Sequence, residues 1–296
     1  MTSRQLELAW QPASAQTTGR TASTVTDGPT PELANYDLIL VNSSAGKDSQ
    51  ATLDVVVAAA RAAGVEDRVI VVHADLGEAE WQGVPELAAE HAAHYGLRFE
   101  ITSNPETILE RTARRGAWPS AKVRWCTSDH KRGPIRKVMT RLVAELRDSE
   151  RVVGRPVRLL NVMGLRAEES AARSRRNPYA PNPSASNGRR QVDDWYPIHG
   201  WTVAQVWERI ATAGTRPHRA YAAGMSRLSC RFCVLAARAD LVCSARLNPE
   251  LAQRYAAVEA QTGHRFRMDL SMAEVIAEAE GHRRACDEEQ LTLLPR

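Results

Sequence analysis

The feature that most constrains the fold is a repeated order of short apolar run, polar turn and helix-like segment. Tyr36–Asn42 (YDLILVN) is apolar enough for a buried strand, and it leads through the polar residues 43–49 into a helix-like segment that ends near Ala63. Further strands are expected at Arg68–His73, Leu97–Thr102 and Val157–Met163, and helices at Pro85–Tyr95 and Pro134–Leu146. Such alternation predicts an α/β fold, with a parallel sheet and helices on both of its faces.

Composition divides the chain into three parts. Thr, Ser, Ala, Pro and Gly dominate residues 11–35, so residues 1–35 are predicted to be a disordered leader. Residues 36–175 carry the alternating pattern and are predicted to be one α/β domain. Residues 176–296 begin with a turn-rich loop at 177–188 and then become mostly helical, with helices expected at Pro249–Thr262 and Met272–Arg284. This last part also carries most of the cysteines.

Charge and hydropathy exclude several classes of protein. The net charge of +4 and the 43% content of hydrophobic residues are ordinary for a globular chain. No run approaches the roughly 18 consecutive apolar residues that a membrane helix needs. Residues 1–20 lack the apolar core of a secretory signal, so a cytoplasmic protein without a membrane partner is expected. Five cysteines in such a chain favour metal or redox chemistry over a disulfide framework.

Residues 43–49 (SSAGKDS) have the composition of an anion-binding loop. They stand between a strand and a helix, where backbone N–H groups and the helix dipole attract negative charge. Lys47 would add a positive charge, and the hydroxyls of Ser44 and Ser49 would donate to phosphate oxygens. Asp48 fits beside an anion only with a divalent cation, which favours Mg²⁺ with a nucleotide. A plain polar helix N-terminus capped by Ser44 is the alternative.

The same segment, Ser44-Ala45-Gly46-Lys47-Asp48-Ser49, resembles the S-G-G-K-D-S pyrophosphate loop of the adenine-nucleotide α-hydrolase superfamily, with Ala45 in place of one glycine. More narrowly, the chain resembles the phosphoadenosine-phosphosulfate-reductase-like branch, which has a Rossmann-like fold. Four further segments stand in that branch's order: His73-Ala74-Asp75-Leu76-Gly77 with Glu80; Arg124-Trp125-Cys126-Thr127 with Lys131; Gly164-Leu165-Arg166 with Glu169 and Arg173; and Tyr196-Pro197-Ile198 through Tyr221 to Cys230-x-x-Cys233. The resemblance covers residues 36–234.

The resemblance implies cleavage of ATP between its α and β phosphates with Mg²⁺, and transfer of AMP to an acceptor oxygen. It implies catalytic roles for Lys47, Asp48 and Arg166. The nucleotide-binding set that it implies is Ser44, Ala45, Gly46, Lys47, Asp48, Ser49, Asp75, Arg166 and Arg173. Two members have equally simple structural explanations: Arg173 as part of a solvated basic helix face, and Asp75 as a capping residue at a strand end.

The cysteines permit either zinc or an iron–sulfur centre. Cys230 and Cys233 form a C-x-x-C pair, and a zinc site would need further ligands from residues such as Cys126, Cys243 or His130. The resemblance implies instead a 4Fe-4S cluster held by Cys126, Cys230 and Cys233, with either Cys243 or an open iron at the fourth position. The residues around Cys286 do not form the E-C-G-x-H-like motif that carries the catalytic cysteine of the sulfonucleotide reductases.

The resemblance is strongest to ATP pyrophosphatase/sulfurtransferase enzymes of DNA phosphorothioation. It implies a cysteine desulfurase as sulfur donor, other modification-complex subunits, and nucleic acid as partner, with DNA favoured over RNA because no RNA-binding module is recognisable. Transfer-RNA thiolation, sulfonucleotide reduction and a non-catalytic, zinc-stabilised nucleic-acid-binding protein are the alternatives. Clusters of basic residues that could contact phosphates occur at Arg111–Arg115, His130–Arg132, Arg173–Arg176 and Arg189–Arg190.

Overall fold

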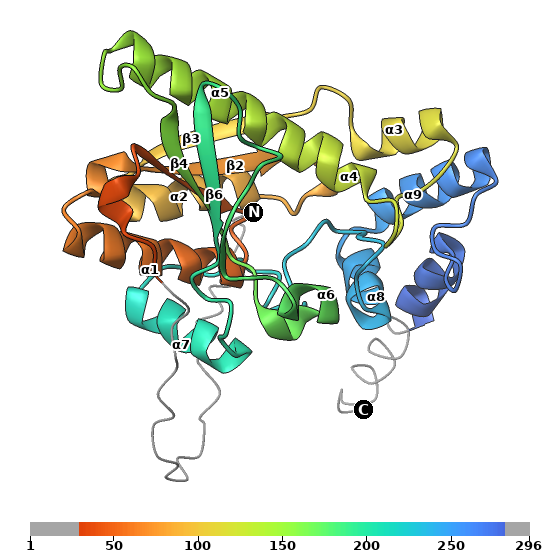
Figure 1. Cartoon of the computed structure of the whole chain (residues 1–296). Helices are drawn as coiled ribbons and strands as arrows, with labels where there is room; N and C mark the ends of the chain where they lie inside the picture. Colours follow the sequence, from red (N-terminus) through yellow and green to blue (C-terminus); the bar gives the residue numbers. More distant parts are fainter. Residues whose placement is uncertain (1–29, 282–296) are drawn as a thin grey trace, which may run out of the picture.

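The computed structural model describes residues 30–281, which build a six-stranded sheet in the order β3-β2-β1-β4-β6-β5 (Figure 1). The strands are β1 Leu38–Ser43, β2 Val69–Asp75, β3 Arg98–Ser103, β4 Val157–Met163, β5 Tyr179–Pro181 and β6 Arg190–Trp195. Every neighbouring pair is parallel except β5 with β6, which pair antiparallel at one edge. The predicted α/β fold with a parallel sheet is thus confirmed.

The side chains of the central strands alternate between two apolar layers. Leu38 and Leu40 of β1 face the layer that holds α5, whereas Ile39 and Val41 face α1. Because both sides of β1 are buried, it reads in sequence as a continuous apolar run. The helices around the sheet are α1 Lys47–Ala62, α2 Val84–His94, α5 Gly133–Asp148 and α7 Val203–Ala213; α7 packs on α1, below the sheet in Figure 1, and α5 crosses above it.

Short helical turns link these elements. They are η1 Leu33–Asn35, η2 Glu66–Arg68, η3 Gly77–Ala79, α4 Trp125–Thr127, η4 Ser128–Arg132, η5 Ala167–Glu169 and α6 Ala171–Ser174. The η4 turn is π-helical and runs directly from α4 into α5. Of the predicted leader, residues 1–29 lie outside the described residues. Leu33 is buried in the core beside α1, so residues 33–35 belong to the packed domain and not to a leader.

A second apolar core lies beside the sheet. It is formed by α3 Ile108–Arg115, α8 Arg238–Leu247, α9 Pro249–Thr262 and a helix at 272–281. Aromatic rings fill its centre: Trp118 stacks on Tyr255 with ring centroids 5.3 Å apart, and Phe266 meets Trp118 edge-on at 5.2 Å. The helices predicted at Pro249–Thr262 and, up to residue 281, at Met272–Arg284 are present; the rest of the latter lies outside the described residues.

The predicted α/β domain ends at residue 175, but β5 and β6 continue the same sheet beyond it. Residues 177–188 are therefore not a single loop, because they contain edge strand β5. β6 was missed because Asp193 and Asp194 make its sequence polar. Within the sheet, Tyr36 Oη donates to Asp193 at 2.7 Å, and Asn161 donates to Asp194 at 2.7 Å. Among the helices of residues 30–281, none has the length and apolar character needed to cross a membrane.

Candidate functional site at the carboxyl edge of the sheet

The loop between β1 and α1 wraps tightly around the start of the helix. The Ser44 N–H donates to Ser49 Oγ at 3.2 Å, and Ser49 Oγ donates to the Gly46 carbonyl at 2.9 Å. Ala45 is buried in the left-handed region with φ of 50°, a conformation that glycine adopts far more easily. Ala45 stands where the resembled pyrophosphate loop has glycine, and in this chain it adopts the left-handed conformation at a conformational cost.

Lys47 is buried and turned toward a distant part of the chain. Its backbone N–H donates to Tyr221 Oη at 2.8 Å, and its Nζ lies 3.4 Å from the Ser226 carbonyl and 3.3 Å from Asp48 Oδ2. The helix N-cap is Gly46, so Ser44 does not cap α1 as the simpler alternative proposed. Burial raises the pKa of Tyr221 well above its ordinary value, so its hydroxyl keeps its proton at neutral pH.

Gly164 allows the segment after β4 to approach α1 closely. A Cβ atom at this position would lie 2.7 Å from the Asp48 carbonyl oxygen and 2.9 Å from Thr52 Oγ1. Real Cβ atoms do not come so close to backbone, so only glycine fits without displacement. This contact brings Arg166 to the loop.

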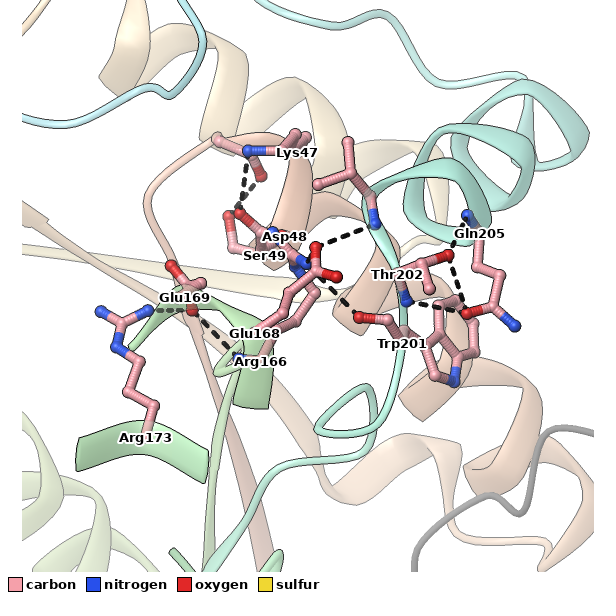
Figure 2. A network of polar contacts seen from close by, with 12 residues as sticks. Lys47, Asp48, Ser49, Arg166, Glu168, Glu169, Arg173, Trp201, Thr202 and Gln205 are labelled. Atoms are coloured by element: carbon pink, nitrogen blue, oxygen red, sulfur yellow. Dashed lines mark hydrogen bonds and ion pairs between the residues drawn. The ribbon is translucent and has the colours of Figure 1, made fainter. Parts of the chain in front are cut away.

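Arg166 is buried and closes a network of charges around α1 (Figure 2). Its Nε donates to Asp48 Oδ1 at 2.5 Å, and its Nη1 pairs with Glu168 and lies 3.3 Å from the Trp201 carbonyl. Burial alone would lower the pKa of Arg166, but the hydrogen bonds that it donates to the Asp48 and Glu168 carboxylates raise it, so the guanidinium stays charged. The predicted residues Lys47, Asp48 and Arg166 therefore lie together, and each is already paired within the chain.

Arg173 lies beside this network in Figure 2 but is bound elsewhere. Its guanidinium pairs with Glu169, whose carboxylate also accepts from the Arg166 backbone N–H at 3.0 Å. Arg173 is thus linked to the loop through Glu169 and does not reach Asp48.

Asp75 stands at the end of β2, next to the loop. Its Oδ1 accepts from the Gly77 N–H at 2.8 Å, the capping role that the sequence left open. His73, buried on the same strand, lies 3.0 Å from Glu80 through Nε2 and Oε2. Burial alone would lower the pKa of His73, but the hydrogen bond and charge of Glu80 raise it.

Three cysteines, Cys126, Cys230 and Cys233, interact with one another and are together called the thiol group. Their thiols interact electrostatically with one another, and the Lys131 ammonium acts on all three. Burial raises the pKa of Cys126, and it raises the pKa of Cys230 to about 12. Protonated thiols are therefore favoured unless a metal replaces the protons.

Cys243 does not join the thiol group. It lies on α8, where its Sγ donates to the Ala223 carbonyl at 3.2 Å and packs near Met225. The charges that act on it come from Arg246 and Asp240. The expectation of a fourth thiolate from Cys243 is corrected accordingly, because α8 places this thiol against the 220–228 segment.

One stretch of chain, residues 221–233, joins the loop to the thiol group. Tyr221 and Ser226 contact Lys47 at one end, and Cys230 and Cys233 stand at the other. Arg231 fixes the cysteine end to the turn after β2, because its backbone N–H donates to the Ala79 carbonyl at 2.8 Å and its Nε donates to the Glu80 carbonyl at 2.5 Å. Contacts along residues 221–233 therefore link the loop, the β2 turn and the cysteines.

The basic clusters divide into satisfied and exposed residues. Arg111 pairs with Glu106 and Asp129, and buried Arg190 donates to the Ala185 carbonyl at 2.8 Å, so neither is available as a simple phosphate contact. Exposed basic side chains on the segments around the thiol group and after Arg173 are Arg115, Lys122, Arg124, Arg132, Arg175 and Arg176.

Several roles escaped the sequence analysis. Tyr221, Ser226 and Glu168 contact Lys47 or Arg166, although no local pattern assigns them those roles. Tyr221 was visible only as part of a family motif. Its 174-residue separation from Lys47 hid the contact.

Comparisons with known proteins identify a matching family and a relative. The sequence model of the family described as phosphoadenosine phosphosulfate reductase domain matches residues 38–236. An uncharacterized 37.8 kDa protein of Escherichia phage 186 is 27% identical over 156 residues, which make up 53% of this chain and 42% of that protein, so the chain spans less than half of that relative's length.

Two solved structures show similarity at low sequence identity. Phosphoadenylyl-sulfate reductase from Candida auris, in a phosphate complex, gives a TM-score of 0.46 at 16% identity and covers 67% of this chain and 83% of that one. FMN adenylyltransferase from Candida glabrata, in complex with FAD and inorganic pyrophosphate, gives a TM-score of 0.43 at 11% identity, with 67% and 58% covered.

Proposed function

Because the chain belongs to the phosphoadenosine phosphosulfate reductase domain family, a nucleotide-binding family of the PP-loop type, we propose that it is an ATP pyrophosphatase and sulfurtransferase that acts on nucleic acid. One observation supports this most: residues 221–233 contact Lys47 at one end and carry Cys230 and Cys233 at the other. A phosphate-binding loop and a metal-binding thiol group on one segment suit an enzyme that activates an oxygen and then replaces it with sulfur.

The first step of the proposed reaction is adenylation. An acceptor oxygen attacks the α phosphorus of ATP, the bond from that phosphorus to the bridging oxygen breaks, and pyrophosphate leaves with the electron pair. Lys47, Mg²⁺ and the N–H groups of the loop would stabilise the charge on the leaving group. Asp48 is the candidate Mg²⁺ ligand, and its bond to Arg166 holds its carboxylate in place at the loop.

The second step is sulfur transfer. Cys126, Cys230 and Cys233 are the proposed ligands of a 4Fe-4S cluster. The electrostatic interactions of these three thiols with one another and with the Lys131 ammonium support the proposal. When bound, such a cluster would supply a place to hold sulfide near the activated atom. A bond from sulfide to that atom would form as its bond to the adenylated oxygen breaks, and AMP would leave with that oxygen. A cysteine desulfurase is the proposed source of the sulfur; it delivers sulfur as a persulfide, so a thiol reductant is needed to supply the two electrons that yield sulfide.

DNA is the proposed acceptor, with further modification-complex subunits as partners. Exposed basic residues such as Arg124, Arg132 and Arg175 lie on the segments next to Cys126 and Arg173, where they can contact backbone phosphates. With a net charge of +4, such contacts are few, which favours a complex in which other subunits share the DNA.

Pyrophosphate release from ATP tests the proposal. The full chain, purified without oxygen, is assayed with Mg²⁺ alone and with DNA or RNA. Lys47→Met keeps the apolar stem but removes the charge, and we expect it to lower the rate at least about a hundredfold. Lys137→Ala, on the exposed side of α5, is the matched control and keeps the rate. No pyrophosphate from the wild-type chain under any of these conditions would refute the proposal, and stimulation by RNA alone would move the acceptor to RNA.

Sulfonucleotide reduction is the second candidate function, because the matched family region, residues 38–236, includes the whole thiol group. It requires sulfite release from phosphoadenosine phosphosulfate or adenosine phosphosulfate with reduced thioredoxin as electron donor. Sulfite release that is faster than pyrophosphate release from ATP would favour sulfonucleotide reduction over the ATP pyrophosphatase function.

A further inference from the structure

Three side chains at the end of β2 present their polar atoms to one point. One ligand atom each from His73, Asp75 and Glu80 lies within 4.8 Å of the other two. His73 and Asp75 project from the same face of the strand because they are two residues apart, and η3 returns the chain so that Glu80 comes back to them. His73 and Glu80 are buried, so this is an interior group and not a chance cluster of surface acids.

His73 is oriented as metal-binding histidines are. Its Nδ1 lies 2.9 Å from the Ser43 carbonyl, which can only accept, so Nδ1 carries a proton. Its Nε2 is then directed at Glu80 Oε2, 3.0 Å away, an oxygen that already accepts from the Leu76 N–H at 3.3 Å. Two acceptors face each other here, and a positive species must lie between them: a second proton on the imidazole or a metal ion. A carbonyl that holds the far nitrogen is the usual outer partner of a histidine ligand.

The distances suit a cation. Metal–nitrogen and metal–oxygen bonds of about 2.0–2.2 Å at right angles separate the two ligand atoms by about 3 Å, as Nε2 and Oε2 are separated. Asp75 uses Oδ1 for the Gly77 N–H, which leaves its second oxygen for a third bond. The Lys131 ammonium acts on Glu80 and offsets one of the two carboxylate charges, so the group keeps a net negative charge.

We propose that His73, Asp75 and Glu80 bind a divalent first-row metal ion of the Mn²⁺, Fe²⁺ or Zn²⁺ class, at a site separate from the thiol group. One imidazole and two carboxylates match the preferences of these ions. His73 pairs in register with Ser43 at the start of the loop. The Glu80 carbonyl accepts from Arg231, which stands between Cys230 and Cys233. The ion would therefore lie between the loop and the thiol group. This site does not depend on ATP cleavage, and its test uses no nucleotide.

Mn²⁺ is the probe, because it binds oxygen and imidazole ligands and competes poorly for thiolates. The full chain is stripped with a chelator and titrated with Mn²⁺, and free Mn²⁺ is followed by electron paramagnetic resonance. We expect one ion per chain. Asp75→Asn keeps an oxygen for the Gly77 N–H and should preserve the fold, yet it should weaken Mn²⁺ binding by at least about tenfold. Mn²⁺ should also raise the Tm of the wild type more than that of Asp75→Asn.

Glu78→Gln is the matched control, since Glu78 lies in the same turn but pairs with Arg254. It should bind Mn²⁺ as the wild type does. The proposal is overturned if the wild type shows no saturable binding, which would make His73 and Glu80 a buried ion pair, or if Asp75→Asn and Glu80→Gln both bind Mn²⁺ unchanged.

Discussion

The two halves of the site differ in how complete they are without a ligand. In the loop half, Asp48 pairs with both Lys47 and Arg166, and Glu168 supplies the second negative charge that balances the two cations. Tyr221 accepts from the Lys47 backbone N–H. In the thiol half, burial raises the pKa of Cys126 and Cys230, so these two thiols stay protonated and uncharged without a metal. The comparison indicates that contacts within the chain already assemble the loop, whereas the proposed cluster would be needed to complete the thiol group.

The largest expected effect is on metal content, which a cysteine variant should lower without affecting the loop. Cys230→Ser should bring iron and sulfide in anaerobically purified protein close to zero, because one of three convergent ligands is gone, while ATP binding persists. Cys243→Ser is the control and should keep its iron, since Cys243 bonds to the Ala223 carbonyl instead. Iron and sulfide analysis together with an ATP-binding assay measures both. Stoichiometric zinc without iron in the wild type would contradict the cluster, and loss of iron in Cys243→Ser would contradict the assignment of its ligands.

The second prediction tests whether the loop half is held by its own charges. Arg166→Gln should lower the free energy of unfolding by about 2 kcal/mol, less than for a fully buried pair because Asp48 and Glu168 are partly exposed. Adding Asp48→Asn should recover part of the loss, as urea denaturation can measure. Arg155→Gln breaks an exposed pair with Asp37 and should cost under about 1 kcal/mol. Equal losses for the two arginine variants would argue against a preassembled loop.

Gly164→Ala tests the contact that brings Arg166 to α1. A Cβ at 2.7 Å from the Asp48 carbonyl must push the two segments apart, at a cost of about 1–3 kcal/mol in unfolding free energy. Nucleotide binding should weaken with it, while the iron content stays unchanged. Gly200→Ala, whose Cβ would meet nothing within 4 Å, provides the comparison. Wild-type stability and ATP affinity in Gly164→Ala would show that the close approach is not needed.

The smallest effect concerns the left-handed residue in the loop. Ala45→Gly removes a backbone cost of about 1–2 kcal/mol and adds back about half of it as unfolded-state entropy, so it should stabilise the chain by roughly 0.5 kcal/mol. Ala51→Gly, within helix α1, should instead destabilise by about 1 kcal/mol. In thermal melts, Ala45→Gly should raise the Tm and Ala51→Gly should lower it. A lower Tm for Ala45→Gly would mean that packing of the Ala45 methyl group contributes more stability than the left-handed backbone costs.

The sequence predicted the elements whose burial is visible in their composition. β1, β2 and β4 are apolar on both faces, and the loop after β1 stands out by its small and charged residues. β6 was not predictable in this way, because partners of its two carboxylates, such as Tyr36 and Asn161, come from distant parts of the chain.

Family motifs predicted which residues belong to the candidate site, but not which of them contact one another. Motif order placed Lys47, Arg166 and the cysteines in one region. It did not show that Arg166 binds Asp48 across 118 positions, because such a contact depends on how β4 packs against α1. Cys243 shows the same limit: a suitable residue type at a suitable distance along the chain was directed elsewhere by its helix.

The π-helical turn at Ser128–Arg132 has a consequence for how the chain tolerates length changes. Such a turn holds one residue more than an α-helical turn, and here it separates Cys126 from the long helix α5. Removing a single residue would convert it to regular α-helix and rotate everything before it by about 100° around the helix axis relative to α5. Cys126 would then point away from Cys230, although every cysteine and every lysine would still be present in the sequence. Chains related to this one should therefore vary in residue type within the turn far more freely than in its length.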